Sequence, residues 1–226
     1  MKPYQPVVIQ LLQQLKPQSV LDAPSGGGWL GSAVMDSCQV DGIDLYAQTN
    51  SFYRTLVARD LNEGIPEEFP RYDCIVCCEG IEHLYAPAAF LQSAREHLQP
   101  GGLLIITTPN VWYPAARLQY FLRGFFPSFP NLVGKIEPGS HMHVTPWTFP
   151  QLYLILRLLG FSNITLHPME QEKPKHVYEY LLGWPHALYC RSRASRAESQ
   201  EEKAYWQMAG SADSLYGRGL VVSARV

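Results

Sequence analysis

Three side chains that can accept a proton stand close together in the chain: Glu79, Glu82 and His83. They occupy positions i, i+3 and i+4, so a helical turn would place all three on one face. Carboxylates and imidazoles are the usual general bases of enzymes. The three residues directly follow an apolar run that begins at Tyr72 and is typical of a strand buried on both faces. Ligands of α/β sheets bind at the carboxyl ends of such strands, so these residues are the first candidates for reactive chemistry.

A glycine-rich loop stands nearer the start of the chain. An apolar run ends in Asp22, the three glycines from Gly26 to Gly28 follow, and an apolar-periodic segment then resumes. A strand, a tight glycine turn and a helix start in this order are typical of the binding point of a nucleotide-binding α/β sheet. Glycine matters there because a side chain would keep the backbone away from the ligand. The loop predicts a nucleotide site, although by itself it also fits a surface turn without a ligand.

Two further acids end the next expected strands. Residues 40–45 are predicted to form a second strand with Asp44 at its tip, 16 residues beyond the last glycine of the loop. A carboxylate at this place can accept hydrogen bonds from both hydroxyls of a ribose. Residues 56–62 are predicted to form a third strand with Asp60 near its end. A helix and a fifth strand over residues 101–110 complete the order of an open parallel sheet covered on both faces.

In this order and spacing, the chain resembles the class I S-adenosylmethionine-dependent methyltransferases of the small single-domain kind. It is similar to the O-methyltransferases of ubiquinone and glycan pathways. The likeness covers about residues 17–167, with a last strand within residues 214–226. Five motifs carry it: the loop after Asp22, the acid Asp44, the pair Asp60-Leu61, the segment Glu79-Gly80-Ile81-Glu82-His83-Leu84, and the turn Leu98-Gln99-Pro100-Gly101-Gly102.

The resemblance implies S-adenosylmethionine as the cofactor. In the family, the second-strand acid holds the ribose, the Asp-Leu pair flanks the adenine, and the acid after the fourth strand meets the amino group. Pro24 departs from the family pattern, which has a glycine there, and proline offers no amide hydrogen to a ligand. The implied cofactor-binding residues are Asp22, Gly26, Gly28, Asp44, Asp60, Leu61 and Glu79.

The implied fold is α/β, a three-layer Rossmann-like sheet of about seven strands, mostly parallel with an antiparallel last strand. The implied reaction is O-methylation of a small or lipid-linked acceptor, such as a glycan sugar or a quinone-like ring. Two alternatives stay open. One is a non-catalytic protein that binds the cofactor. The other is an NAD-dependent oxidoreductase, which the lack of G-x-G-x-x-G spacing disfavours.

A second resemblance concerns the acceptor side. The segment that begins at His143 resembles the His-x-x-x-Trp-Thr element of small-RNA 2′-O-methyltransferases, in which an E-x-x-E-H motif and a distal histidine hold a divalent cation. The matching residues here are Glu79, Glu82, His83 and His143, and they would suit Mg²⁺ or Mn²⁺. Three hypotheses stay open: this metal site, a metal-free catalytic base at His83 or His143, and purely structural roles. His141 replaces His143 if the loop register differs by two.

Composition limits the class of protein. The chain has 226 residues, 46% of them hydrophobic and 17% charged, which is typical of a globular domain. The net charge is −2, so the chain lacks the excess of basic residues that DNA-binding proteins need. The chain contains no run of 18 apolar residues and no signal peptide, so we expect a cytoplasmic protein, or one that also touches the inner face of a membrane. Three of the five cysteines share one strand and are expected to fill the core.

We expect one domain over residues 1–226, with its core over about 17–167. An aromatic-rich insert over about 111–147 has three interpretations: a lid over the acceptor pocket, a membrane-surface contact, or core packing. The second rests on Trp112, Tyr113 and the Phe125-Phe126-Pro127 tip near Arg117 and Arg123.

Further elements are expected around and after this insert. A helical turn or two is expected in the connection over residues 46–55. A helix over 146–160 begins at the N-cap Thr148, and a sixth strand covers residues 161–167. A C-terminal helix and the last strand, over residues 213–226, lie within residues 171–226.

Overall fold

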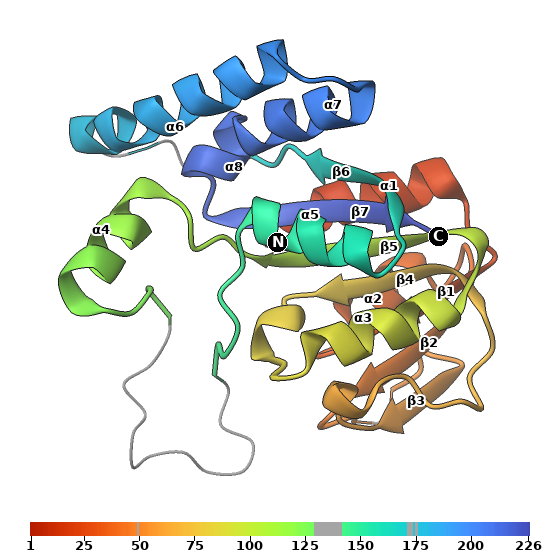
Figure 1. Cartoon of the computed structure of the whole chain (residues 1–226). Coiled ribbons are helices and arrows are strands. Elements are labelled where there is room, and N and C mark those ends of the chain that lie inside the picture. The colour runs from red at the N-terminus through yellow and green to blue at the C-terminus, as the bar shows by residue number, and fades with distance from the viewer. Residues whose placement is uncertain (49, 129–141, 171–173, 175) are drawn as a thin grey trace.

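The central element is a sheet of seven strands in the order β3-β2-β1-β4-β5-β7-β6 (Figure 1). This computed structural model describes residues 1–48, 50–128, 142–170, 174 and 176–226. Strands β1 to β5 run parallel, whereas β7 pairs antiparallel with both β5 and β6, as expected. The strands are β1 (Ser19–Asp22), β2 (Gln39–Asp44), β3 (Thr55–Ala58), β4 (Tyr72–Cys78), β5 (Leu98–Pro109), β6 (Ser162–His167) and β7 (Gly219–Arg225).

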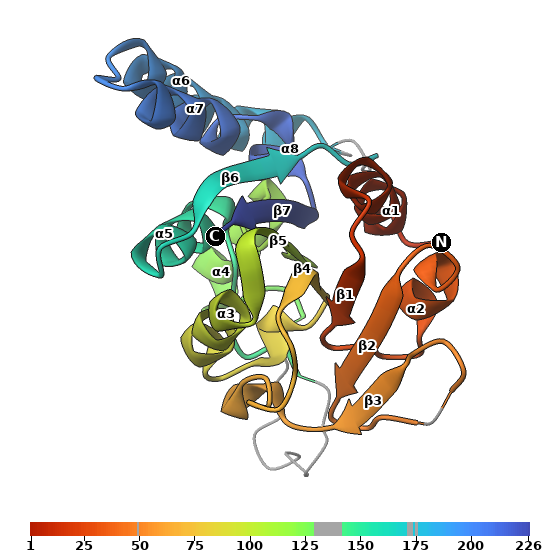
Figure 2. The ribbon, with the colours of Figure 1, turned by 90° about the vertical axis from the view of Figure 1, so that its right-hand side faces the viewer.

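Helices cover both faces of the sheet, which gives the expected three layers (Figure 2). On one face lie α1 (Tyr4–Leu15) and α2 (Trp29–Val34), and on the other lie α3 (Pro87–Glu96) and α5 (Phe149–Leu158). Successive strand residues enter opposite cores: Val76 packs with α1 and α2, whereas Ile75 packs with α3 and α5. The remaining helices are the short 3₁₀ turns η1 (Leu61–Glu63) and η2 (Ile81–His83), and α4 (Pro114–Arg123), α6 (Val177–Ser195), α7 (Gln200–Ala209) and α8 (Ala212–Tyr216).

The start of α5 confirms the predicted N-cap. The hydroxyl of Thr148 accepts a hydrogen bond from the amide of Gln151 (3.3 Å), and the Gln151 side chain accepts one from the amide of Thr148 (3.2 Å). This reciprocal pair satisfies two amides that a helix start leaves without intrahelical partners. Within the described ranges, no helix is both long and apolar enough to cross a membrane.

The cysteines of β4 are buried free thiols, as predicted. Cys77 belongs to the core beside α3 and α5, whereas Cys74 and Cys78 belong to the core beside α1 and α2. Cys74 and Cys77 therefore point to opposite faces of the sheet and cannot share a metal ion. Their role is to fill the two cores.

Three predicted elements differ from the structure. The connection from β2 to β3 contains no helix in its described residues, and Tyr53 from this segment packs on α2 instead. The third strand ends at Ala58, and the turn η1 begins at Leu61, where strand was still expected. The last strand begins at Gly219, because Ser211 caps the short helix α8 where strand was expected.

Gly31 of α2 tests how tightly this connection is packed. A Cβ atom on Gly31 would lie 2.8 Å from the ring of Tyr53, which cannot retreat easily because its hydroxyl donates a 2.6 Å hydrogen bond to Asp22. We expect Gly31→Ala to lower the free energy of unfolding by about 1–3 kcal/mol, measured by urea denaturation. Gly27→Ala is the control, since nothing lies within 4 Å of its added Cβ. Equal stability of the two variants would contradict this packing.

Candidate active site

A cavity of about 710 Å³ opens at the carboxyl ends of the strands in the first half of the sheet. Its wall combines the glycine loop, the tips of β2 and β4, the turns η1 and η2, the start of α1 and a segment near the end of the insert. Its volume lies within the range of about 300–1,000 Å³ that is usual for ligand sites. Among the predicted site residues, those that line it are Gly26, Asp44, Asp60, Leu61, Glu79, Glu82, His83 and His143.

The glycine loop presents its backbone to the cavity at Gly26 and Gly27. An added Cβ would meet nothing within 4 Å at either position, so both face open space. The amide of Gly26 donates a 2.8 Å hydrogen bond to Asp44, which ties the loop to the tip of β2. Gly28 does not line the cavity. It takes φ +81° as the N-cap of α2, and its added Cβ would lie 3.0 Å from Phe52, so its role is conformational.

Asp22 lies beneath the loop and not in the cavity wall. Its side chain is fully buried, one oxygen accepts a hydrogen bond from the hydroxyl of Tyr53, and the other has no partner among the described residues. Burial, helped by the charge of Asp44, raises the pKa of the Asp22 carboxyl to about 7. Asp22 therefore acts on the loop through its hydrogen bond to Tyr53 and not through the cavity wall.

The acids Asp44 and Asp60 are held by neighbouring amides. Asp44 accepts hydrogen bonds from the amides of Gly26 (2.8 Å) and Tyr46 (2.9 Å), one on each oxygen. Asp60 caps η1 by accepting from the amide and the side chain of Asn62, both at 2.8 Å. These bonds fix both carboxylates at the cavity wall and leave lone pairs for a ligand.

Glu79 takes a different position from the one expected. It adopts a left-handed backbone with φ +50° and precedes η2, so it does not share a helical face with Glu82 and His83. Its amide donates to the carbonyl of Thr107 (2.9 Å), and its carboxyl accepts from the Thr107 hydroxyl (3.3 Å). Burial raises the pKa of this carboxyl, while Lys2 opposes the rise. The prediction of three residues on one face was therefore wrong for Glu79.

Glu82 and His83 come together with His143, which stands 60 residues later than His83 in the chain. The amides of Val144 and Thr145 both donate to the carbonyl of Glu82, at 2.8 and 3.0 Å, and this pins the later segment on η2. The rings of the two histidines lie edge to face with centroids 4.9 Å apart. One ligand atom from each of the three side chains lies within 4.8 Å of the other two.

The surroundings of Glu82 and His83 determine the pKa of the carboxyl and the tautomer of the imidazole. Glu82 is 2% exposed and accepts a 3.0 Å hydrogen bond from Thr108, and burial together with the charge of Glu79 raises its pKa to about 8. The Nδ1 atom of His83 lies 2.6 Å from the carbonyl of Met142. A carbonyl only accepts, so Nδ1 carries the proton and Nε2 is the nitrogen that can accept one.

Sequence reasoning missed the contribution of the N-terminus. Lys2, Tyr4 and Gln5 line the same cavity. Tyr4 is 8% exposed and packs edge to face on Trp29, yet its hydroxyl makes no hydrogen bond to the described part of the chain. Burial and the nearby acids raise the pKa of this phenol. No local signal marks these residues, because only the packing of α1 on the sheet brings them here.

The insert is divided between two places. Residues 142–144 line the cavity, whereas the described residues 111–128 do not. The indole of Trp112 donates a 2.9 Å hydrogen bond to His186 of α6, so this part of the insert packs on the C-terminal helices. His141, the alternative to His143, lies outside the described residues.

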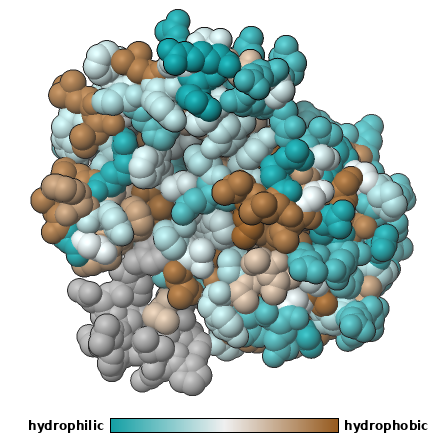
Figure 3. Space-filling view, viewed as in Figure 1, coloured by the Kyte–Doolittle hydropathy of each residue, from teal (hydrophilic) through white to brown (hydrophobic). Residues whose placement is uncertain are grey.

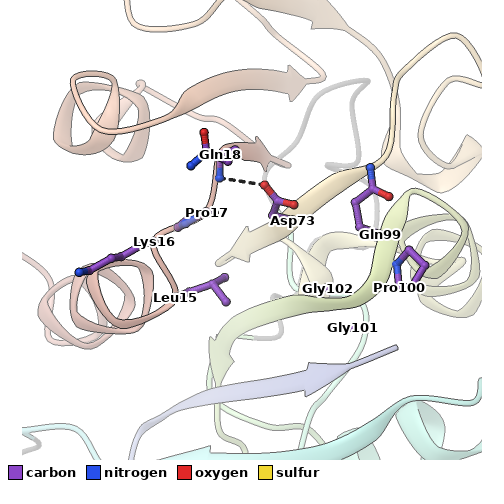
Figure 4. Close-up of a pocket in the computed structure, with 9 residues that line it drawn as sticks. All are labelled: Leu15, Lys16, Pro17, Gln18, Asp73, Gln99, Pro100, Gly101 and Gly102. Atoms are coloured by element: carbon purple, nitrogen blue, oxygen red, sulfur yellow. Dashed lines mark hydrogen bonds between the residues drawn. The ribbon is translucent and has the colours of Figure 1, made fainter.

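A second hollow, of about 270 Å³, lies at the amino ends of β1 and β4, between the end of α1 and the first residues of β5 (Figure 4). Its only acid is Asp73, which already accepts hydrogen bonds from the amides of Gln18 (2.8 Å) and Ser19 (3.0 Å). This carboxylate fastens the start of β1 to β4. The hollow offers little chemistry for a reaction.

Comparison with known proteins agrees with the geometry. The family model described as a methyltransferase domain matches residues 3–166. The chain is 28% identical over 149 residues to a ubiquinone biosynthesis O-methyltransferase of Hydrogenovibrio crunogenus, covering 60% of this chain and 58% of that protein. It is 33% identical over 117 residues to the protein of the same name from Leptothrix cholodnii, covering 45% and 48%. The chain thus spans about half the length of these relatives.

A solved structure supports the fold. The crystal structure of a SAM-dependent methyltransferase from Archaeoglobus fulgidus superimposes with a TM-score of 0.56 at 15% identity, covering 98% of this chain and 94% of that one.

The raised pKa of Asp22 predicts a pH dependence of stability. The folded carboxyl has a pKa of about 7, above the unfolded value of 3.8, so the folded state binds more protons between these values. Stability is therefore highest below the unfolded value and falls as the pH rises to about 7, by at most about 1.4 kcal/mol per pH unit from this group. We expect Asp22→Asn, which keeps an acceptor for Tyr53, to flatten this slope in urea denaturation measured from pH 4 to 8. An unchanged slope would contradict the assignment.

Proposed function

The chain belongs to the S-adenosylmethionine-dependent methyltransferase family, and we propose that it methylates a hydroxyl of a small or lipid-linked acceptor. A glycan sugar and a quinone-like ring are the acceptor classes we favour. The observation that carries the proposal is the trio of Glu82, His83 and His143 in the wall of the cavity that the glycine loop also lines. The family match removes the NAD-dependent alternative.

The described residues fit the cofactor of the family. Gly26 and Gly27 offer backbone at an open surface, and Asp44 and Asp60 stand at two neighbouring strand ends of one cavity. We assign Asp44 to the ribose hydroxyls, Asp60 and Leu61 to the two sides of the adenine, and the carboxyl of Glu79 to the amino group. Asp22 and Gly28 lie outside the cavity wall, so they position the loop and do not touch the ligand. Asp22 acts through Tyr53, and Gly28 acts through its left-handed backbone.

The cofactor supplies a methyl group already activated on a sulfonium. The cavity walls align the acceptor oxygen and exclude water, an effect that can contribute about 7–11 kcal/mol. The acceptor hydroxyl must also lose its proton. His83 suits that task, since Met142 fixes its tautomer with Nε2 as the accepting nitrogen. His143, beside its ring, orients the acceptor or takes the same role.

A divalent cation is the second candidate for activating the acceptor. The close approach of Glu82, His83 and His143 favours it, and the Met142 carbonyl on His83 resembles the supporting contacts of metal-bound histidines. Glu79 lies outside this trio, so it is not a ligand of the proposed cation. Two imidazoles with one carboxylate suit Mn²⁺ better than Mg²⁺, which prefers oxygen ligands.

Cofactor binding is tested first. We expect Asp44→Asn to weaken the binding of S-adenosylhomocysteine by about tenfold or more, because one carboxylate oxygen that accepts from the ribose becomes a donor. Isothermal titration calorimetry measures this. Asp36→Asn is the matched control, an exposed acid just after α2, and should bind like the unaltered chain. Equal affinity of Asp44→Asn and the control would mean that the ribose acid is misassigned.

Acceptor activation is tested next, by release of S-adenosylhomocysteine from a panel of nucleotide sugars, glycans and catechols. With a metal-free base, EDTA has no effect, one histidine variant alone abolishes turnover, and the rate rises with pH through an imidazole-like pKa. With a metal, EDTA abolishes turnover, Mn²⁺ restores it, and calorimetry detects Mn²⁺ binding that His83→Ala and His143→Ala both lose.

Two outcomes would count against acceptor activation by the trio. Full turnover in the His83→Ala, His143→Ala double variant would leave alignment alone as the catalytic device. Cofactor binding without turnover on any acceptor would favour the non-catalytic alternative.

A further inference from the structure

The long helix α6 exposes large apolar side chains and buries an acid. Its buried residues are Glu179, Gly183 and Cys190, which lie along one face. Gly183 allows close packing, because an added Cβ would run into the ring of Tyr216. The outward face over residues 177–189, where a helix in contact with water normally carries charges, is apolar instead. Its exposed large side chains are Val177, Tyr178, Tyr180, Leu181, Leu182, Trp184, Leu188 and Tyr189.

Helix α4 extends this apolar surface. Phe121 is 83% exposed and Leu122 is 69% exposed, near the end of the helix. The two helices are tied together, since the guanidinium of Arg117 donates a 3.1 Å hydrogen bond to the carbonyl of Leu182. Figure 3 shows hydrophobic side chains gathered on the left of the view, where α4 and the start of α6 lie in Figure 1. We call the exposed residues of α4 and α6 the α4–α6 face.

The exposed charges of the α4–α6 face are all positive. Arg123 of α4 and Arg191 and Arg193 of α6 are exposed, and Arg196 follows directly at the C-cap. Arg193 pairs with Glu202 of α7, whereas Arg123, Arg191 and Arg196 form no ion pair with any described residue. The acid of α6, Glu179, is buried, and α4 has none. An apolar face rich in Tyr and Trp with unpaired arginines matches the interfacial region of a bilayer with anionic headgroups.

We propose that the α4–α6 face binds the surface of an anionic phospholipid bilayer, with α6 lying in the plane of the headgroups. A second copy of the chain fits less well, because it would bring the same unpaired arginines together. The proposal does not depend on which acceptor is methylated. It would keep the enzyme at a surface where lipid-linked molecules lie.

The test is flotation of the full chain with vesicles. One set consists of phosphatidylcholine alone, and the other contains about a quarter phosphatidylglycerol. We expect binding to the anionic set that weakens as salt is added. The variant Phe121→Ser/Leu181→Ser/Trp184→Ser should bind at least about tenfold more weakly, because three exposed apolar side chains no longer insert. The matched control is Leu154→Ser/Leu158→Ser on α5, with side chains 60% and 78% exposed, and should bind normally.

A second variant separates the charge from the apolar contact. Arg123→Gln/Arg191→Gln/Arg196→Gln should lower the affinity for anionic vesicles by about fivefold per arginine and remove most of the salt dependence. Thermal unfolding and S-adenosylhomocysteine titration check that every variant folds. Failure of the unaltered chain to float with anionic vesicles would overturn the proposal, as would equal binding by the serine triple variant. A dimer in solution that this variant loses, without vesicle binding, would assign the face to a second copy instead.

Discussion

The two hydrogen bonds that the carbonyl of Glu82 accepts from the amides of Val144 and Thr145 determine the geometry of the cavity wall that carries His83 and His143. They join the turn after β4 to the last residues of the insert, about 60 residues later in the chain. The hydroxyl of Thr145 adds a 2.7 Å hydrogen bond to the carbonyl of Leu84, which fixes the register of the contact. The proximity of His143 to His83 depends on these backbone contacts, because no regular element holds the later histidine in place.

The glycine-loop side of the cavity depends on close packing between the segments that follow β1 and β4. An added Cβ on Gly80 would collide with the ring of Pro24, so the loop after β1 and the turn after β4 can meet only because Gly80 has no side chain. The missing side chain of Gly80 leaves the space that the ring of Pro24 occupies. Glu79 has a left-handed backbone in the same turn, and its carboxyl accepts a hydrogen bond from Thr107 and does not join the trio of Glu82, His83 and His143.

Electrostatics link the two sides of the cavity. Asp22, Glu79 and Glu82 all have raised pKa values because burial disfavours their charged forms, and the charge of a second acid contributes for Asp22 and Glu82. Lys2 from the N-terminus opposes the rise for Glu79 and Glu82. A bound ligand that carries positive charge, such as a sulfonium, would lower these pKa values, because it would favour the charged carboxylates. The N-terminal residues therefore tune the site as well as line it.

Local sequence patterns determined many of the secondary-structure elements of this protein. The apolar runs of β1, β2 and β4, the glycine loop and the N-cap Thr148 were readable from the sequence, because strand alternation, turn chemistry and helix capping involve residues close together in the chain. Only the tertiary structure decided the rest. Tyr53 packs where a connecting helix was expected, Glu79 leaves the face of Glu82 and His83, and Tyr4 reaches the cavity. These positions follow from contacts between distant segments, which no local period or spacing encodes.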